Sequence, residues 1–290
     1  MPSAAEPPPA TRSGGDPDHE DPSTDLTPDL ARELAELAEV VGAAAADLLA
    51  GALDQARSSV STKSSTTDLV TEMDRSAELL IVERLLQARP DDGMLGEEGA
   101  ERAGTSDVRW VIDPLDGTTN YVYRHPGIAV SIAAEVDGRV EAGVVVDVLT
   151  GDRFRAVRGA GATRNGRAIT VSTETDLSRA LVATGFGYQP EQRRHQGQVL
   201  GGVLPHIRDI RRMGSAALDL CSVACGRVDA YYELSLSRWD FAAGALIAAE
   251  AGAVVVDLGG EPPRAAPLLA APPALAEPLR ALLLAAGAVA

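Results

Sequence analysis

Residues 113–118 read Asp-Pro-Leu-Asp-Gly-Thr and follow a short apolar run at 110–112, so two carboxylates and a hydroxyl lie within one tight turn. A turn of three residues sends Asp113 and Asp116 toward one point, and Gly117 lets a ligand approach the backbone closely. Oxygen atoms of this kind are the ligands that Mg2+ prefers, and the ion also binds phosphate groups. The spacing therefore indicates a metal site for chemistry on a phosphate ester.

Three further acidic clusters occur where predicted elements begin or end: Asp68 to Asp74, Glu97-Glu98, and Asp240 after Trp239. Each cluster alone has an ordinary explanation, because Asp is common in turns and at helix starts and Glu is common in solvated loops. Two metal ions that share carboxylates can activate a water and also stabilise a leaving alkoxide. The clusters together predict a polynuclear Mg2+ centre for the hydrolysis of phosphate esters.

Composition narrows the possible partners and locations. A chain of 290 residues with 45% hydrophobic content can bury a substantial core. The net charge of -16 argues against a general DNA-binding or anionic-membrane surface. The two cysteines, Cys221 and Cys225, are spaced i, i+4 in an apolar helical pattern and are expected to pack, so a metal site needs oxygen ligands. No signal peptide or bilayer-spanning run is predicted. We therefore expect a cytoplasmic protein with no direct nucleic-acid partner and no membrane partner.

The chain is predicted to consist of a tail and one domain. Residues 1–28 are rich in acidic residues, Pro, Ser and Gly, which predicts a disordered acidic tail. The single domain is predicted at 29–290, with an α+β lobe at 29–175 that carries the first metal motif. An α/β lobe at 176–290 carries the second.

Periodicity predicts the elements that must position these clusters. A long helix is expected to start at the pair Thr27-Pro28, and a second is expected to start at Thr71, which forms a capping-box pattern with Asp74, and to end before Pro90. An antiparallel meander is predicted within 108–157, and a layered α/β region follows. In the second half we predict strands at 181–184, 207–213, 228–233 and 253–256, helices at 192–203, 214–225 and 240–251, and a last helix near 275–285.

The set of motifs strongly resembles the inositol monophosphatase family, which belongs to the Mg2+-dependent, lithium-sensitive phosphatases. Residues 113–121 resemble its first motif and residues 239–252 its second, while 63–74 and 96–98 match in order and approximate spacing. The match covers about residues 30–260. It implies a layered α/β (α+β) fold, the five-layer αβαβα sandwich of the inositol monophosphatase and fructose bisphosphatase type. It also implies a homodimer.

The resemblance implies two to three Mg2+ ions per subunit, all held by oxygen atoms. The implied ligands are Glu97, Asp113, the Leu115 carbonyl and Thr118 for the first ion, Asp113, Asp116 and Asp240 for the second, and Glu97 and Asp74 for a third, weaker site. The implied catalytic residues are Glu97, Thr118, Asp74 and Asp113, of which Glu97 and Thr118 would orient the attacking water. Lys63, Asp68 and Glu98 would lie just behind the ligands.

The expected substrate follows from the segment 229–233, which resembles the inositol-phosphatase pattern of a strand that ends in Glu233. A fixed carboxylate can read the adjacent hydroxyls of a cyclic polyol in pairs. We therefore expect hydrolysis of inositol monophosphate to myo-inositol and phosphate by a metal-activated water, without a covalent intermediate. The implied substrate-binding residues are Asp116, Gly117, Thr118, Gly214, Ser215, Ala216, Glu233 and Asp240.

Several alternatives stay open at this point. Family members also act on histidinol phosphate, fructose 1,6-bisphosphate or adenosine 3',5'-bisphosphate. Residues 211–220 resemble bacterial inositol monophosphatases, some of which bind the transcription machinery, so a regulatory protein with a secondary phosphatase site is a second class of hypothesis. A purely Ca2+-binding module fits poorly because no EF-hand loop is present. Cysteine-, histidine- and aspartyl-phosphatase signatures are also absent, which leaves direct water attack.

Overall fold

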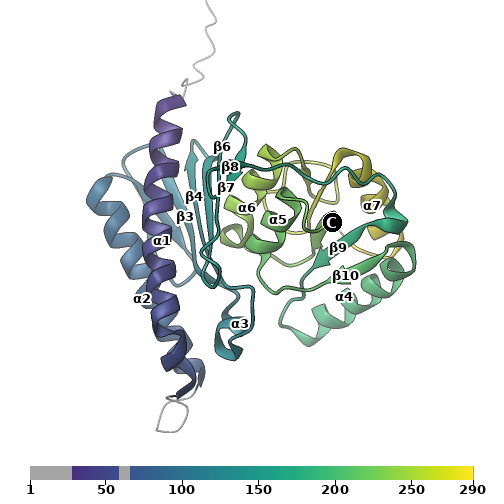
Figure 1. The fold of residues 1–290 in the computed structure, drawn as a ribbon, viewed down its shortest axis with the longest axis horizontal. Helices are drawn as coiled ribbons and strands as arrows, with labels where there is room; N and C mark the ends of the chain where they lie inside the picture. The colour runs from purple at the N-terminus through teal and green to yellow at the C-terminus, as the bar shows by residue number, and fades with distance from the viewer. Residues whose placement is uncertain (1–27, 59–65, 290) are drawn as a thin grey trace, which may run out of the picture.

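The computed structural model describes residues 28–58 and 66–289 (Figure 1). Within these ranges, the side chains of residues 54–58 and 66–71 are not described. Lys63, the side chain of Asp68 and the predicted tail up to residue 27 therefore lie outside what is described. Within the described residues, no helix is both long enough and apolar enough to span a lipid bilayer.

Five layers alternate between helices and sheets, in the order αβαβα (Figure 1). One pair of helices covers the outer face of an eight-stranded sheet, a second pair lies between the two sheets, and a third covers the outer face of a five-stranded sheet. This order confirms the predicted fold class. The three helical layers are α1 (Pro28–Ser58) with α2 (Thr66–Ala88), α5 (Ala216–Ala224) with α6 (Arg238–Glu250), and α4 (Pro190–Val203) with α7 (Pro273–Ala285).

The eight-stranded sheet has the order β2-β1-β3-β4-β5-β6-β7-β8, with only the β1–β3 pair parallel. Every residue of β4 and every residue of β5 after Arg139 is buried, because helices cover both faces of the sheet. The predicted meander corresponds to β4, β5 and β6. The strands are β1 (Gly93–Gly96), β2 (Glu101–Arg102), β3 (Val108–Asp116), β4 (Ala129–Val136), β5 (Arg139–Asp147), β6 (Arg153–Val157), β7 (Ala162–Arg164) and β8 (Arg167–Ala168).

The five-stranded sheet has the order β10-β9-β11-β13-β12. Its strands β10, β9 and β11 run parallel, as expected from alternating strands and helices, and β13 pairs antiparallel to both of its neighbours. Its strands are β9 (Leu181–Thr184), β10 (Asp209–Arg211), β11 (Ala230–Glu233), β12 (Val254–Val256) and β13 (Leu268–Ala271). Shorter elements are α3 (Thr118–Tyr123), η2 (Leu177–Arg179) and η3 (Leu204–His206).

The start of α2 differs from the prediction. The helix begins at Thr66, so Thr71 lies inside it and the predicted capping box at Thr71 and Asp74 is wrong. A Thr and an Asp three residues apart also occur inside helices, where both side chains share one face. Asp68 and Asp74 therefore lie within the helix, and Asp74 is buried on its inner side.

Candidate metal centre

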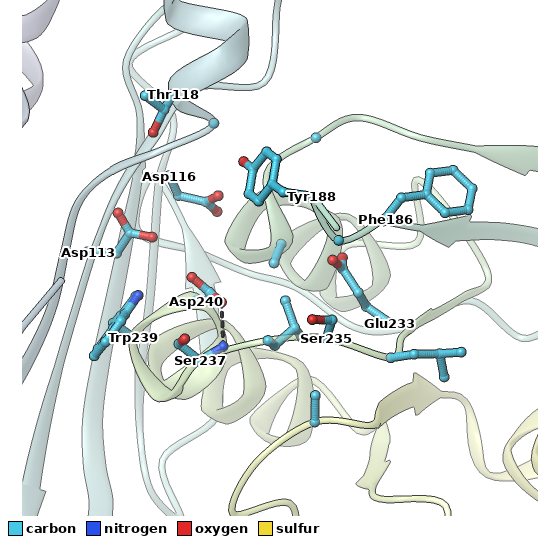
Figure 2. A pocket seen from close by; sticks show the side chains of 18 of the residues that line it. Asp113, Asp116, Thr118, Phe186, Tyr188, Glu233, Ser235, Ser237, Trp239 and Asp240 are labelled. Carbon is cyan, nitrogen blue, oxygen red and sulfur yellow. Dashed lines mark hydrogen bonds between the residues drawn. The ribbon is translucent and has the colours of Figure 1, made fainter. Parts of the chain in front are cut away.

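An irregularity in β3 positions the first acidic motif. The pairing of β3 with β4 shifts register between Asp113 and Asp116, at Pro114, which has no N–H to donate to a neighbouring strand. The Asp113 carboxylate accepts a hydrogen bond from the backbone N–H of Leu115 at 3.0 Å, which closes a short turn. The irregularity leaves both carboxylates directed into one cavity (Figure 2).

Gly117 and Thr118 continue the chain from this turn into α3. Gly117 has φ 94°, and a Cβ atom there would lie 2.3 Å from the carbonyl oxygen of Gly127, so the position requires glycine. The Thr118 hydroxyl donates to the carbonyl oxygen of Leu115 at 3.2 Å. The hydroxyl and the carbonyl that the resemblance assigns to the first ion are therefore neighbours.

Asp116 connects the first sheet to the middle helices. Its Oδ2 atom accepts hydrogen bonds from the Ser215 hydroxyl at 2.7 Å and from the backbone N–H of Ala217 at 2.8 Å. Ser215 is the N-cap of α5 and also accepts from the N–H of Leu218. The start of α5 is thus fixed directly to the acidic turn, and Ser215 acts on Asp116 without lining the cavity.

The start of α6 brings Asp240 to the same cavity. Asp240 is residue N3 of a capping box, in which its Oδ2 atom accepts from the N–H of Ser237 at 2.6 Å (Figure 2). An ion pair fixes this end of the helix to the first sheet, because Arg238 donates to Glu135 of β4 at 2.9 and 2.7 Å. The capping bond uses one oxygen of Asp240, so the other is available to a ligand.

Glu97 is held in place by a residue that the sequence reasoning missed. The buried carboxylate of Glu78, on α2, accepts hydrogen bonds from the backbone N–H groups of Glu98 and Ala100, both at 3.0 Å. A Cβ atom at Gly96 would lie 2.1 Å from Glu78 Oε2, so the contact also requires this glycine. The only signal in the sequence is the i, i+4 spacing of Asp74 and Glu78, which places both on one face of α2.

Asp74 and Glu98 lie behind the cavity rather than on its wall. Burial, followed by the charges of Glu98, Glu97 and Glu78, raises the pKa of Asp74 to about 8. Arg75 lies 3.9 Å from Glu98 and is largely exposed, so it offsets little of this charge. The carboxyl of Asp74 therefore belongs to the same electrostatic cluster without lining the cavity.

The four inner carboxyls, Glu97, Asp113, Asp116 and Asp240, are all harder to ionise than in water. Burial raises the pKa of Asp113 well above its usual value, and the charges of Asp116, Glu97 and Asp240 raise it further. Burial likewise raises the pKa of Glu97 and Asp116 to about 7 and that of Asp240 to about 6. A bound cation would favour the ionised form of each group.

This donor set fits Mg2+ rather than an ion that needs a closed protein cage. Among the described side chains, no three acidic, His or Cys residues form a group close enough to hold an ion by themselves. Mg2+ keeps several waters and takes its remaining oxygens from one or two carboxylates and from phosphate. The carboxylates here, with a carbonyl and a hydroxyl beside them, suit this mode of binding.

The cavity has a volume of about 570 Å3, and most of the predicted site residues line it. Its far side was not predicted, because the segment 185–189 and the residues around Ser235 carry no motif. The predicted residues on its wall are Glu97, Asp113, Leu115, Asp116, Gly117, Thr118, Gly214, Ala216, Glu233 and Asp240, and the unpredicted ones include Phe186, Tyr188, Gln192, Arg212, Ser235 and Trp239.

Glu233, at the end of β11, lies across the cavity from the inner carboxyls (Figure 2). It accepts a hydrogen bond from the buried Tyr231 hydroxyl at 2.7 Å, and burial raises its pKa to about 7. A Cβ atom at Gly185 would lie 1.9 Å from Glu233 Oε2, so the carboxylate occupies space that only glycine leaves open. The cavity therefore has a metal-binding side and a separate carboxylate opposite it.

Comparison with known proteins identifies relatives of this chain. The model of the inositol monophosphatase family matches residues 30–286. Inositol-1-monophosphatase SuhB of Mycobacterium tuberculosis strain H37Rv is 52% identical over 206 residues, which cover 68% of this chain and 71% of the relative. Nus factor SuhB of Escherichia coli K12 is 45% identical over 195 residues, 67% of this chain and 73% of the relative. The structure of Mycobacterium tuberculosis SuhB superposes with a TM-score of 0.79 at 41% identity and covers 90% of this chain and 99% of its own.

Proposed function

The chain belongs to the inositol monophosphatase family and is a phosphatase, and we propose that it hydrolyses inositol monophosphate to myo-inositol and phosphate with two to three Mg2+ ions. The observation that carries the proposal is that four converging carboxyls and Glu233 face each other in one cavity. One side of this cavity suits metal ions and a phosphate. The opposite side suits the hydroxyls of a polyol.

The metal ligands are proposed from the family resemblance, and all of them except Asp74 line the cavity. Glu97, Asp113, the Leu115 carbonyl and Thr118 would hold one ion, and Asp113, Asp116 and Asp240 a second. Asp74 and Glu97 would hold a third, weaker one. When bound, Mg2+ would make a water acidic enough to act as nucleophile and would offset the charge on the phosphate and on the leaving alkoxide.

The residues around the metals have separate tasks in this proposal. The Thr118 hydroxyl donates its proton to the Leu115 carbonyl, so its oxygen remains free to accept a hydrogen bond from the attacking water. Glu97 would accept the second hydrogen bond from the same water, so that the two acceptors orient it. The N–H groups of Gly117 and Thr118 would bind phosphate oxygens.

Glu233 supports a polyol as the leaving alcohol. Its carboxylate is anchored by Tyr231 and confined by Gly185, so it presents fixed acceptors to adjacent hydroxyls. Gly214 and Ala216 line the same part of the cavity, where a bulky side chain would compete with a ring. The arrangement favours inositol phosphate over a small acyclic ester.

Phosphate release with Mg2+ tests this proposal directly. The panel contains inositol 1-phosphate, glycerol 2-phosphate, fructose 1,6-bisphosphate, adenosine 3',5'-bisphosphate and histidinol phosphate, with EDTA controls. We expect the highest kcat/KM for inositol 1-phosphate, and a larger loss on that ester than on glycerol 2-phosphate for Glu233→Gln. Preference for another ester would overturn the proposed substrate, and equal losses would make Glu233 structural.

A transcription-machinery partner is a second proposal, supported by the relatives named Nus factor SuhB. It requires a cytoplasmic protein. Pulldown of RNA polymerase at physiological salt tests it, with Asp113→Asn as the control that separates binding from catalysis. Equal recovery of polymerase with both proteins would support a regulatory role, whereas no recovery would count against it.

A further inference from the structure

Three backbone segments meet behind the cavity wall, at Gly117, Gly127 and Gly214. A Cβ atom at Gly117 would lie 2.3 Å from the carbonyl oxygen of Gly127 and 3.4 Å from that of Gly214. Gly117 and Gly214 line the cavity, on the side proposed for the phosphate and on the side proposed for the polyol. The two sides therefore approach each other at backbone distance, because glycine has no side chain to separate them.

The side-chain amide of Asn120 joins these segments. Asn120 lies on α3 and is buried. Its Nδ2 atom donates to the carbonyl oxygen of Gly127 at 2.7 Å and to that of Met213 at 2.8 Å, which uses both N–H groups of the amide. A Cβ atom at Gly127 would lie 3.0 Å from this nitrogen, and one at Gly214 would lie 3.1 Å from it. The amide thus fills the space between the glycines and connects residues 93 positions apart in the chain.

The segment that Asn120 holds leads directly into the start of α5. Met213 is followed by Gly214 and then by Ser215, the N-cap of α5, whose hydroxyl donates to Asp116 at 2.7 Å. The segment is therefore attached at its start to a neutral amide and two residues later to a carboxylate. Both attachments lead back to the chain around the first acidic motif, where the phosphate would bind.

We propose that Asn120 is a positioning residue for the substrate, which sets the distance between the phosphate side and the polyol side of the cavity. This inference rests on the proposed function, because it assigns the two sides to the two parts of the ester. The backbone atoms that it positions belong to Gly117 and Thr118 on one side and to Gly214 and Ala216 on the other. Asn120 itself does not line the cavity and acts through these atoms. Its amide does not ionise, so the contact is the same with and without bound metal ions.

Substrate selectivity tests this role, because a displaced wall should affect a ring more than a small alcohol. Asn120→Asp keeps the size of the side chain but replaces two donors with a carboxylate that only accepts, whereas Asn120→Ser keeps one donor. The values of kcat/KM would be measured with Mg2+ on inositol 1-phosphate and on glycerol 2-phosphate. The ratio of the two values should fall about 10-fold or more in Asn120→Asp, mainly through a higher KM for inositol 1-phosphate, and should fall less in Asn120→Ser.

Asn165→Asp is the matched control. Asn165 lies between β7 and β8, is exposed and does not line the cavity, and its Nδ2 atom donates to Asp152 at 2.8 Å. The substitution again removes an amide donor that faces an oxygen, so it should leave the ratio of kcat/KM values unchanged. Calorimetric titration should give the same Mg2+ affinity for Asn120→Ser, Asn165→Asp and the unmodified protein, because neither substitution removes a proposed ligand.

Hydrogen exchange in EDTA gives a readout that does not depend on catalysis. A peptide that spans residues 212–218 should exchange faster in both Asn120 variants than in Asn165→Asp or the unmodified protein, whereas one that spans residues 140–146 of β5 should not change. If Asn120→Asp does not fold, Asn120→Ser decides both measurements.

Three results would overturn the positioning role: equal losses on the two substrates, no loss on either, or unchanged exchange at 212–218. Failure of the unmodified protein to hydrolyse inositol 1-phosphate would instead overturn the proposed function. The role in positioning substrate would then be lost with it, even where exchange at 212–218 is faster.

Discussion

The ion pair between Arg238 and Glu135 should contribute more to stability than a surface pair of the same geometry. Arg238 donates to Glu135 at 2.9 and 2.7 Å, and Arg280 donates to Glu277 at 2.8 and 2.9 Å. The arginine side chains are equally exposed, at 24% and 25%, but the acceptors differ, at 1% for Glu135 and 69% for Glu277. A comparison of the unfolding free energies of Arg238→Met and Arg280→Met therefore tests the effect of burying the acceptor carboxylate.

The magnitude follows from what Glu135 loses. Hydrogen bonds to charged groups contribute about 1.5–3 kcal/mol each, and removing one partner of a buried pair costs about 3–5 kcal/mol when the other charge is left alone. Glu135 keeps a second partner, Arg109, at 2.9 Å, so we expect about 2–3 kcal/mol for Arg238→Met. That loss corresponds to a Tm lower by about 4–10 °C. Water screens the exposed pair, so Arg280→Met should stay close to the unmodified protein.

Urea unfolding in EDTA would give both free energies, and calorimetric titration would give Mg2+ affinity. Arg238 lies at the start of α6, two residues before Asp240, so its loss should also weaken Mg2+ binding, whereas Arg280→Met should not change it. Arg280→Met also removes a hydrogen bond from Arg280 to the carbonyl oxygen of Leu258. This extra loss works against the expected difference, so a smaller destabilisation by Arg280→Met than by Arg238→Met would be strong support. Equal destabilisation by the two variants would refute the reasoning from acceptor burial.

Three further outcomes are expected. Asp113→Asn should lower turnover by several orders of magnitude, because it removes a proposed metal ligand. It should not lower the Tm of the metal-free protein, because it also removes the repulsion between Asp113 and the neighbouring carboxylates. Near-normal turnover would contradict the proposed site. Gly185→Ala should raise KM for inositol 1-phosphate by displacing Glu233, while Gly197→Ala, where a Cβ meets nothing within 4 Å, should leave KM unchanged. The raised pKa values of Glu97 and Asp116 mean that the folded protein binds protons more tightly than the unfolded chain. The free energy of unfolding measured in EDTA should therefore fall as the pH rises from about 4 to about 7. A free energy that does not change with pH, or that falls equally with Mg2+ present, would count against this.

The sequence could predict the acidic side of the cavity because each of its motifs is local. Residues 113–118 form one turn, and Asp240 occupies a helix start, so short-range spacing determines how these side chains point. Family resemblance then related segments that are far apart in the chain. The meander and the alternating strands and helices after it followed from periodicity, which is strong in long elements, whereas the αβαβα order was implied by the resemblance.

The remaining features depend on contacts between distant segments. Glu78 holds the loop of Glu98 and Ala100 across 20 and 22 residues, and no local pattern distinguishes it from an ordinary helical glutamate. Strand β13 follows a stretch rich in Ala and Pro, so only its pairing with β11 and β12 identifies it. Arg212 reached the cavity wall through the packing of β10 against β9, which periodicity cannot place.

The hydrogen bonds of Asp116 to Ser215 and Ala217, across 99 and 101 residues, also bear on how the protein folds. A nascent chain that has emerged only as far as the first sheet carries the acidic turn without the helix that fixes it. Contacts between such distant segments form late, because the loop between them must be closed first. Metal uptake should therefore follow synthesis of the second half, and Mg2+ should slow unfolding more than it accelerates folding. Stopped-flow refolding with and without Mg2+ would show this order of events.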